Sequence, residues 1–171
     1  MNARQFPCFD ETTAPLAARE ALATTKRAFG MLPEPLARYA SSPLTLTTAL
    51  AGLDAFEKGT LLPLEREVLA MTIGRRNGCH FCLAFHRRLL GAQKAPAELV
   101  DALEAGQPLS DPRLEALRGF VLALLDRTGD VTLATWTTFR EAGYTHEQAL
   151  EVVTGVAVYT LTTFANRLVE I

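Results

Sequence analysis

The sequence has no excess of charge of either sign, because 17 Lys and Arg residues nearly balance 19 Asp and Glu residues among 171. A net charge of −2 provides no electrostatic footprint for nucleic acid or for an anionic membrane surface, so we expect neither as a partner. Hydrophobic residues make up 49% and charged residues 21% of the chain, which excludes disorder and a collagen-like structure. A chain of this length can bury a substantial core without disulfides or a structural metal.

A long apolar run is also missing. The most apolar late stretch, residues 152–165, is too short to span a bilayer and is interrupted by four threonines. The first residues carry one early arginine, Arg4, with no apolar run behind it, which is unlike a secretory signal peptide. We therefore expect a soluble, cytoplasmic protein.

Patterns of β-structure are absent as well, since no segment shows strand alternation bounded by turn signals. Helix starts are frequent instead: Ser42-Pro43 and Asp111-Pro112 each place a cap before proline, and Thr145 with Gln148 forms a capping-box pattern. The sequence predicts an all-α fold of about nine helices. They are expected over residues 15–30, 33–41, 42–59, 63–77, 79–93, 96–106, 111–125, 132–143 and 145–171.

These signals predict an N-terminal arm over residues 1–14 and a single helical domain over residues 15–171. The last helix, residues 145–171, is apolar around most of its circumference, and a helix of that kind is buried on nearly all sides. Two interpretations of it stay open: a central core helix, or an interface between subunits of an oligomer.

Cysteine is scarce, and three residues do not form the disulfide framework of a small secreted protein. Cys8 stands alone and is expected to be a bystander thiol. Cys79 and Cys82 form a C-x-x-C pair within residues 79–86, which read Cys-His-Phe-Cys-Leu-Ala-Phe-His. This stretch holds two of the three cysteines and two of the three histidines, so it is the chemically richest part of the chain.

The spacing of this stretch predicts redox chemistry at the start of a helix. At about 100° per residue, Cys79, Cys82 and His86 share a narrow stripe. The helix macrodipole favours a thiolate in the first turn, and an imidazole one turn beyond Cys82 can accept its proton. A second thiol three residues away can attack a sulfenic acid and release water, leaving a disulfide.

A carboxylate partner for His86 follows from the turn at residues 77–78. If the helices on either side form an antiparallel hairpin, residues at equal height have numbers that sum to about 153, which pairs His86 with Glu67. The helical wheel turns Glu67 inward and Glu65 toward solvent. A buried glutamate needs a partner, and His86 would supply one.

Two other interpretations of the cluster remain open. Cys79 and Cys82 could be unrelated core cysteines, because free cysteine is often buried. Together with His86 and Glu67 they could also hold a zinc ion, although structural zinc sites usually lie in loops with a second close pair, which is absent here. We expect neither a metal nor a cofactor.

The order Glu67, eleven residues, Cys79-x-x-Cys82, three residues and His86 resembles the signature of the alkylhydroperoxidase D-like group of the carboxymuconolactone decarboxylase superfamily. The resemblance covers about residues 40–125. It implies an all-helical fold, usually in trimers or hexamers, and an antioxidant, thiol-dependent peroxidase activity on hydrogen peroxide or alkyl hydroperoxides. It also implies that Cys82 is the peroxidatic cysteine, that Cys79 resolves, and that Glu67 and His86 form a proton relay.

The resemblance leaves two points open, the identity of the reacting cysteine and the role of His80. Helix-terminus physics favours the thiolate at Cys79, whereas the resemblance and the spacing to His86 favour Cys82. Some members carry a histidine directly before the second cysteine, where this sequence has Phe81, so a role for His80 is open.

A peroxidase cycle needs an external thiol reductant, for which we expect a dihydrolipoyl or thioredoxin-like partner. Two other functions are retained as alternatives. One is a lyase acting on a cyclic organic acid, as the decarboxylases of the superfamily do without a C-x-x-C pair. The other is a non-catalytic redox-sensing oligomer.

Overall fold

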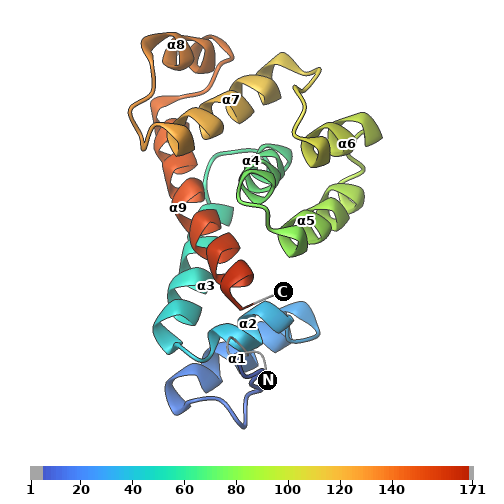
Figure 1. The fold of residues 1–171 in the computed structure, drawn as a ribbon, viewed down its shortest axis with the longest axis vertical. Helices are drawn as coiled ribbons and strands as arrows, with labels where there is room; N and C mark the ends of the chain where they lie inside the picture. The colour runs from blue at the N-terminus through green and yellow to red at the C-terminus, as the bar shows by residue number, and fades with distance from the viewer. Residues whose placement is uncertain (1–5, 170–171) are drawn as a thin grey trace.

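The computed structural model describes residues 6–169, and over these residues the chain forms nine α-helices and no strand (Figure 1). The predicted all-α class is confirmed, and the helix ends agree with the predicted ones to within one turn. The helices are α1 Leu16–Phe29, α2 Glu34–Tyr39, α3 Pro43–Glu57, α4 Pro63–Arg76, α5 His80–Ala92, α6 Ala97–Ala105, α7 Pro112–Asp126, α8 Leu133–Glu141 and α9 His146–Leu168.

Three helix starts are fixed by the local signals that the sequence predicts. The Ser42 side chain accepts a hydrogen bond from the backbone N–H of Thr45, and Asp111 caps α7 in the same way. Thr145 and Gln148 form a reciprocal capping box, with both side-chain-to-backbone distances 3.0 Å. Each cap satisfies backbone donors that the first turn of a helix leaves without partners.

The helix at the centre of the fold is α4, which packs against α5, α6, α7 and α9 (Figure 1). Val68, Leu69, Met71 and Ile73 are completely buried, although they point in different directions around the helix. A helix that is surrounded in this way has no solvent-facing side along its middle.

The prediction that Glu65 faces solvent is therefore wrong. Its exposed fraction is 1%, and its carboxylate accepts a hydrogen bond from the Leu62 backbone N–H at 2.8 Å. The other oxygen lies 2.9 Å from Nε of Arg113 on α7. The helical wheel assigns a wet face to α4, but α7 covers that face and supplies a guanidinium to balance the buried charge.

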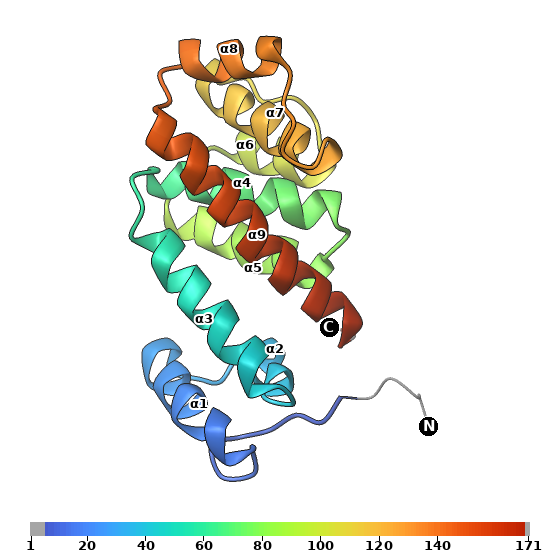
Figure 2. The same ribbon diagram turned by 90° about the vertical axis from the view of Figure 1, so that its left-hand side faces the viewer.

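The long helix α9 is buried on one side only. Figure 2 shows it crossing in front of α4. Gly155 permits this contact, since a Cβ at that position would lie 2.7 Å from the Phe56 ring and 2.9 Å from the Leu69 side chain. The opposite side exposes four apolar residues: Leu150, Val153, Phe164 and Leu168. Helix α9 is therefore not the central core helix.

Both ends of the chain extend beyond the described residues. The predicted extension of the last helix to residue 171 falls partly on residues 170–171, which lie outside the described residues, as do residues 1–5 of the predicted arm. Within the rest of that arm, the Phe9 backbone N–H donates to the Ala37 carbonyl at 3.2 Å, and Ala14 is buried. No helix among the described residues is long and apolar enough to cross a membrane.

Buried residues form two clusters. The larger one surrounds α4 and extends to α6, α7, α8 and α9. The smaller one joins α1, α2 and the first half of α3, with Leu22 and Leu46 at its centre and Val169 packed into it. The N-terminal helices therefore pack against the end of α9, which brings α2 close to the functional region described below.

All three tyrosines of the sequence, Tyr39, Tyr144 and Tyr159, are buried, and burial raises the pKa of each phenol above its ordinary value of 10.0. Unfolded tyrosines ionise near that ordinary pKa while the folded ones stay neutral. Burial of the neutral phenols therefore stabilises the folded chain fully below pH 10, and this stabilisation is lost as the pH rises above 10.

In a spectrophotometric titration, we expect no tyrosinate absorbance above pH 10 until the chain unfolds. A gradual rise near pH 10 with unchanged circular dichroism would contradict this.

Candidate functional site

The C-x-x-C pair lies at the junction of α4 and α5. Gly78 adopts a positive φ of 65°, which turns the chain out of α4, and the Cys79 backbone N–H then donates to the Gly74 carbonyl at 2.9 Å. Cys79 is the N-cap of α5, because its sulfur accepts a hydrogen bond from the Cys82 backbone N–H at 3.3 Å. The predicted position at a helix start is thus confirmed.

The two cysteines form a disulfide, with Cα atoms 5.3 Å apart. Both are shielded from solvent, with exposed fractions of 1% for Cys79 and 5% for Cys82. Gly74 lets the two helices approach closely at this level, since a Cβ there would touch the Cys82 Cβ at 3.4 Å. The thiol pair is therefore held by tight packing of the hairpin.

The hairpin also brings Glu67 and His86 together, as the register of the two helices predicts. Oε2 of Glu67 lies 2.8 Å from Nδ1 of His86, and both side chains are buried. A carboxylate can only accept a hydrogen bond, so the hydrogen of the neutral imidazole lies on Nδ1 and Nε2 carries a lone pair. The contact therefore fixes the tautomer in which His86 can act as a base.

Cys82 and His86 line one cavity of about 310 Å³, which Cys79 does not reach. Its walls come from α1, α2, α3, α4, α5 and α9, and most of them are apolar. The apolar lining residues are Phe29, Pro33, Pro35, Leu36, Leu53, Phe81, Phe85 and Leu89. A molecule in this cavity would meet Cys82 rather than Cys79.

Other polar side chains also reach this site, and the sequence interpretation missed three that contact the predicted residues or one another: Tyr39, Tyr159 and Asn166. The Tyr159 ring packs edge-on against His86, with ring centroids 5.4 Å apart. Nδ2 of Asn166 lies 3.2 Å from the Cys82 sulfur, and Tyr39 donates a hydrogen bond to Oδ1 of Asn166. Tyr159 and Asn166 lie on the buried side of α9, where their polar groups interrupt the apolar pattern. This interruption was the feature of the sequence that could have indicated them.

Other residues weighed from the sequence lie elsewhere. His80 is the first residue of α5, is exposed and does not line the cavity, and Cys8 is also exposed. Among residues 6–169, no group of three or more His, Cys, Asp or Glu side chains is arranged to hold a metal ion.

Comparison with known proteins supports the resemblance. Residues 44–123 match the model of the carboxymuconolactone decarboxylase family. The fold is similar to that of an alkylhydroperoxidase AhpD core protein from Ralstonia eutropha JMP134, an uncharacterised peroxidase-related protein, with a TM-score of 0.82 and 21% identity over 95% of this chain and 88% of that one. The chain is therefore similar to the carboxymuconolactone decarboxylase family over residues 44–123, and its fold is AhpD-like.

Two more solved structures share the AhpD-like fold. An uncharacterised peroxidase-related protein from Silicibacter sp. TM1040 has a TM-score of 0.77 and 20% identity, covering 95% of this chain and 86% of that one. A protein of unknown function from Agrobacterium tumefaciens has a TM-score of 0.65 and 15% identity, covering 75% and 88%. No curated protein sequence matches the chain significantly.

The stretch that matches the superfamily contains only part of the site. Glu67, the two cysteines and His86 lie within residues 44–123, whereas Tyr39 and Asn166 lie outside it. The candidate site of this chain is therefore completed by α2 and α9.

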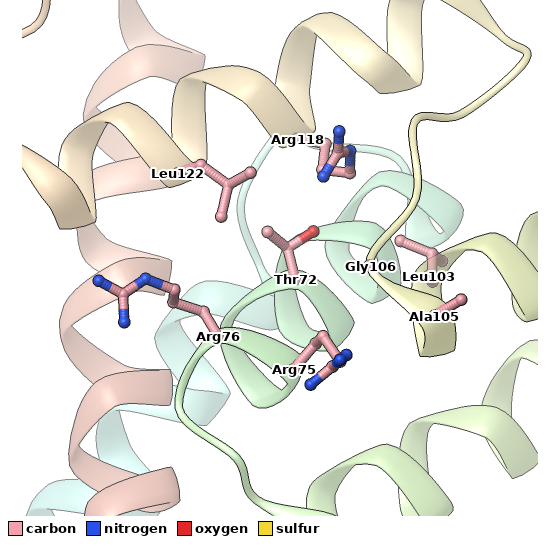
Figure 3. A pocket seen from close by; sticks show the side chains of 8 residues that line it. All are labelled: Thr72, Arg75, Arg76, Leu103, Ala105, Gly106, Arg118 and Leu122. Atoms are coloured by element: carbon pink, nitrogen blue, oxygen red, sulfur yellow. The ribbon is translucent and has the colours of Figure 1, made fainter.

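A second cavity, of about 320 Å³, lies between α4, α6 and α7 (Figure 3). Arg75, Arg76 and Arg118 line it, with Arg76 paired to Asp126 at 2.9 Å and Arg118 to Glu115 at 2.7 Å. Its lining contains no thiol, imidazole or carboxylate, so the cavity with Cys82 and His86 remains the candidate site.

Replacing either member of the Glu67–His86 pair should make the reduced cysteines less nucleophilic. His86→Gln removes the base and Glu67→Gln weakens it, so the pH profile of alkylation by iodoacetamide should shift to higher pH in both variants. Because the two residues act as a unit, the double variant should resemble His86→Gln alone. Reaction with hydroperoxide should slow by ~100- to 10,000-fold in His86→Gln.

A suitable control is Glu57→Gln, since Glu57 lines the same cavity but is half exposed and pairs with Arg66 at 3.1 Å. Glu65→Gln does not serve, because Glu65 is buried against Arg113. If Glu57→Gln shifted the alkylation profile as far as Glu67→Gln, the Glu67–His86 contact would have no specific role.

Proposed function

We propose that the protein is a thiol-dependent peroxidase that reduces hydroperoxides through Cys82 and Cys79. The observation that carries the proposal is the buried disulfide pair with the Glu67–His86 contact on the same cavity. The superfamily match and the fold shared with peroxidase-related proteins support the same reaction class.

The proposed reaction begins with the Cys82 thiolate attacking the distal oxygen of a hydroperoxide, ROOH. The O–O bond breaks, Cys82 becomes a sulfenic acid, and the RO⁻ fragment takes a proton from His86 and leaves as ROH. The Cys79 thiol then attacks the Cys82 sulfur, so that the disulfide forms and water leaves. Glu67 stabilises the imidazolium in the first step, as a carboxylate does in a nucleophile–histidine–acid triad.

Cys82 is the better candidate for the attacking thiol because it lines the cavity together with His86, one helical turn away. The aromatic and aliphatic walls favour a hydroperoxide with an apolar organic group, since apolar surface is stabilised by leaving water. Hydrogen peroxide gains nothing from these walls. An alkyl or aryl hydroperoxide should therefore react faster than hydrogen peroxide.

The cycle closes when an external dithiol reduces the Cys79–Cys82 disulfide, and we propose a dihydrolipoyl or thioredoxin-like donor for this step. Such donors operate in the reducing cytoplasm, where we place the protein.

A thiol count on the reduced protein tests the proposal. One equivalent of cumene hydroperoxide should remove two thiols per chain, and the peptide containing Cys79 and Cys82 should lose two hydrogens while Cys8 stays free. Cys79→Ser should stop at a sulfenic acid on Cys82 that dimedone traps, whereas Cys82→Ser should not react. Absence of any thiol loss would exclude both the peroxidase and the redox-sensor alternative. Oxidation without turnover in the presence of excess dithiol would favour the sensor.

We also propose that the protein assembles as a homo-oligomer through the exposed side of α9. Leu150 and Phe164 lie two heptads apart on this helix, with Val153 and Leu168 beside them, and each is between 46% and 71% exposed. Exposed apolar side chains lined up as a stripe along one side of a helix are costly to leave in water. The resemblance favours a trimer or hexamer.

Light scattering should therefore give a mass that is three or six times 18.6 kDa. Phe164→Glu should lower the mass toward that of one chain, because it places a charge in the apolar contact. The matched control is Leu133→Glu on α8, which is 79% exposed but lies off the stripe. A monomer at micromolar concentration in the unmodified protein would exclude the assembly.

A further inference from the structure

Asn166, near the end of α9, places its side-chain amide against the sulfur atoms of Cys79 and Cys82. Its Nδ2 lies 3.2 Å from the Cys82 sulfur and 3.7 Å from the Cys79 sulfur, and its exposed fraction is 4%. Within residues 6–169, no other side chain hydrogen-bonds the Cys82 sulfur. A buried asparagine is stable only where both ends of its amide find partners.

The chemistry of the partners fixes the orientation of this amide. The sulfur atoms of a disulfide carry no hydrogen, so the group that faces them must be the donor, which is the NH₂ end. The oxygen end then faces the Tyr39 hydroxyl, which donates to it. The opposite orientation would place an acceptor against two atoms that have no hydrogen to give.

Tyr39 is well suited to hold the amide in this orientation. Its hydroxyl also lies 2.9 Å from the Thr162 carbonyl oxygen, so both neighbours are acceptors and the phenol must act as the donor. Burial raises the pKa of Tyr39, which keeps the phenolic hydrogen in place across the physiological range. Tyr39 thus directs the NH₂ group of Asn166 to the sulfur.

We propose that Asn166 is a further catalytic residue, donating a hydrogen bond that stabilises the Cys82 thiolate, and that Tyr39 is its positioning residue. A hydrogen bond to a charged acceptor is stronger than one to a neutral acceptor, so this amide favours the thiolate over the thiol. The inference rests on the proposed function only in taking Cys82 as the reacting thiol.

The same hydrogen bond has a consequence for reduction of the disulfide. When an external dithiol reduces the disulfide, the Cys79–Cys82 bond breaks, the donor is oxidised to its own disulfide, and Cys82 becomes a thiolate. The Asn166 amide stabilises that thiolate, so the reduced form is favoured and the pair is a stronger oxidant. Asn166 therefore acts on both halves of the cycle.

The experiment compares four proteins in which Cys79→Ser isolates Cys82: the parent, Asn166→Leu, Asn166→Asp and Tyr39→Phe. Alkylation by iodoacetamide is followed against pH. Asn166→Leu should slow alkylation near neutral pH by ~10- to 100-fold, which is the effect of losing one hydrogen bond to a charged group. Asn166→Asp keeps the shape but replaces the donor with a negative acceptor, so it should slow alkylation at least as much. Tyr39→Phe should give a smaller shift in the same direction.

The matched control is Thr163→Val, which removes a partly buried hydrogen bond, 2.9 Å long, from the Asn77 amide to the Thr163 hydroxyl on α9 and does not touch sulfur. It should leave the alkylation profile unchanged. In the protein with both cysteines, equilibration with glutathione should show that Asn166→Leu makes the disulfide harder to reduce and that Thr163→Val does not.

An unchanged alkylation profile in folded Asn166→Leu would overturn the inference, and so would an equal shift in Thr163→Val. If Asn166→Leu does not fold, Asn166→Asp and Tyr39→Phe decide the question in the same way. None of these measurements uses a hydroperoxide. If the peroxidase proposal is wrong, the reduced thiols of the wild-type protein will not react with a hydroperoxide.

Discussion

The fold depends on how one buried helix balances its charges. Helix α4 is covered on every side, yet it carries Glu65 and Glu67, and each carboxylate meets a cationic or hydrogen-donating partner. Arg113 binds Glu65 from α7, and His86 binds Glu67 from α5. Removing one member of such a buried pair typically costs about 3–5 kcal/mol, because the other charge remains without compensation. These two contacts therefore fix α5 and α7 around α4, and one of them also prepares the imidazole for chemistry.

Local signals in the sequence were sufficient for most of this arrangement. Proline and cap residues predicted most of the helix starts, because these residues act on the first turn without help from the rest of the chain. The Glu67–His86 contact was predictable for a similar reason, since a tight turn at residues 77–78 leaves little freedom in the register of the two helices. The wrong placement of Glu65 has a tertiary cause: a helical wheel finds the more polar side of a helix, but not whether another helix covers that side.

The parts of the site that the sequence interpretation missed come from distant segments. Tyr39 and Asn166 are separated by 127 positions, and only the packing of α2 against the end of α9 brings them to the sulfur. No local pattern specifies such a meeting. The asparagine on the buried side of α9 was a visible signal, but it did not indicate which atom the amide would reach.

The position of the Asn166 amide depends on Gly155, a residue without a side chain. α9 lies directly against Phe56 and Leu69 at that point, and the helix continues as a stiff rod for eleven residues, roughly 16 Å, to Asn166. A methyl group at position 155 would force either these side chains or the rod to shift, and a shift of the rod would carry the amide away from the sulfur at its other end. The freedom of position 155 to vary in evolution is therefore limited by the chemistry at Cys82, although the two never touch.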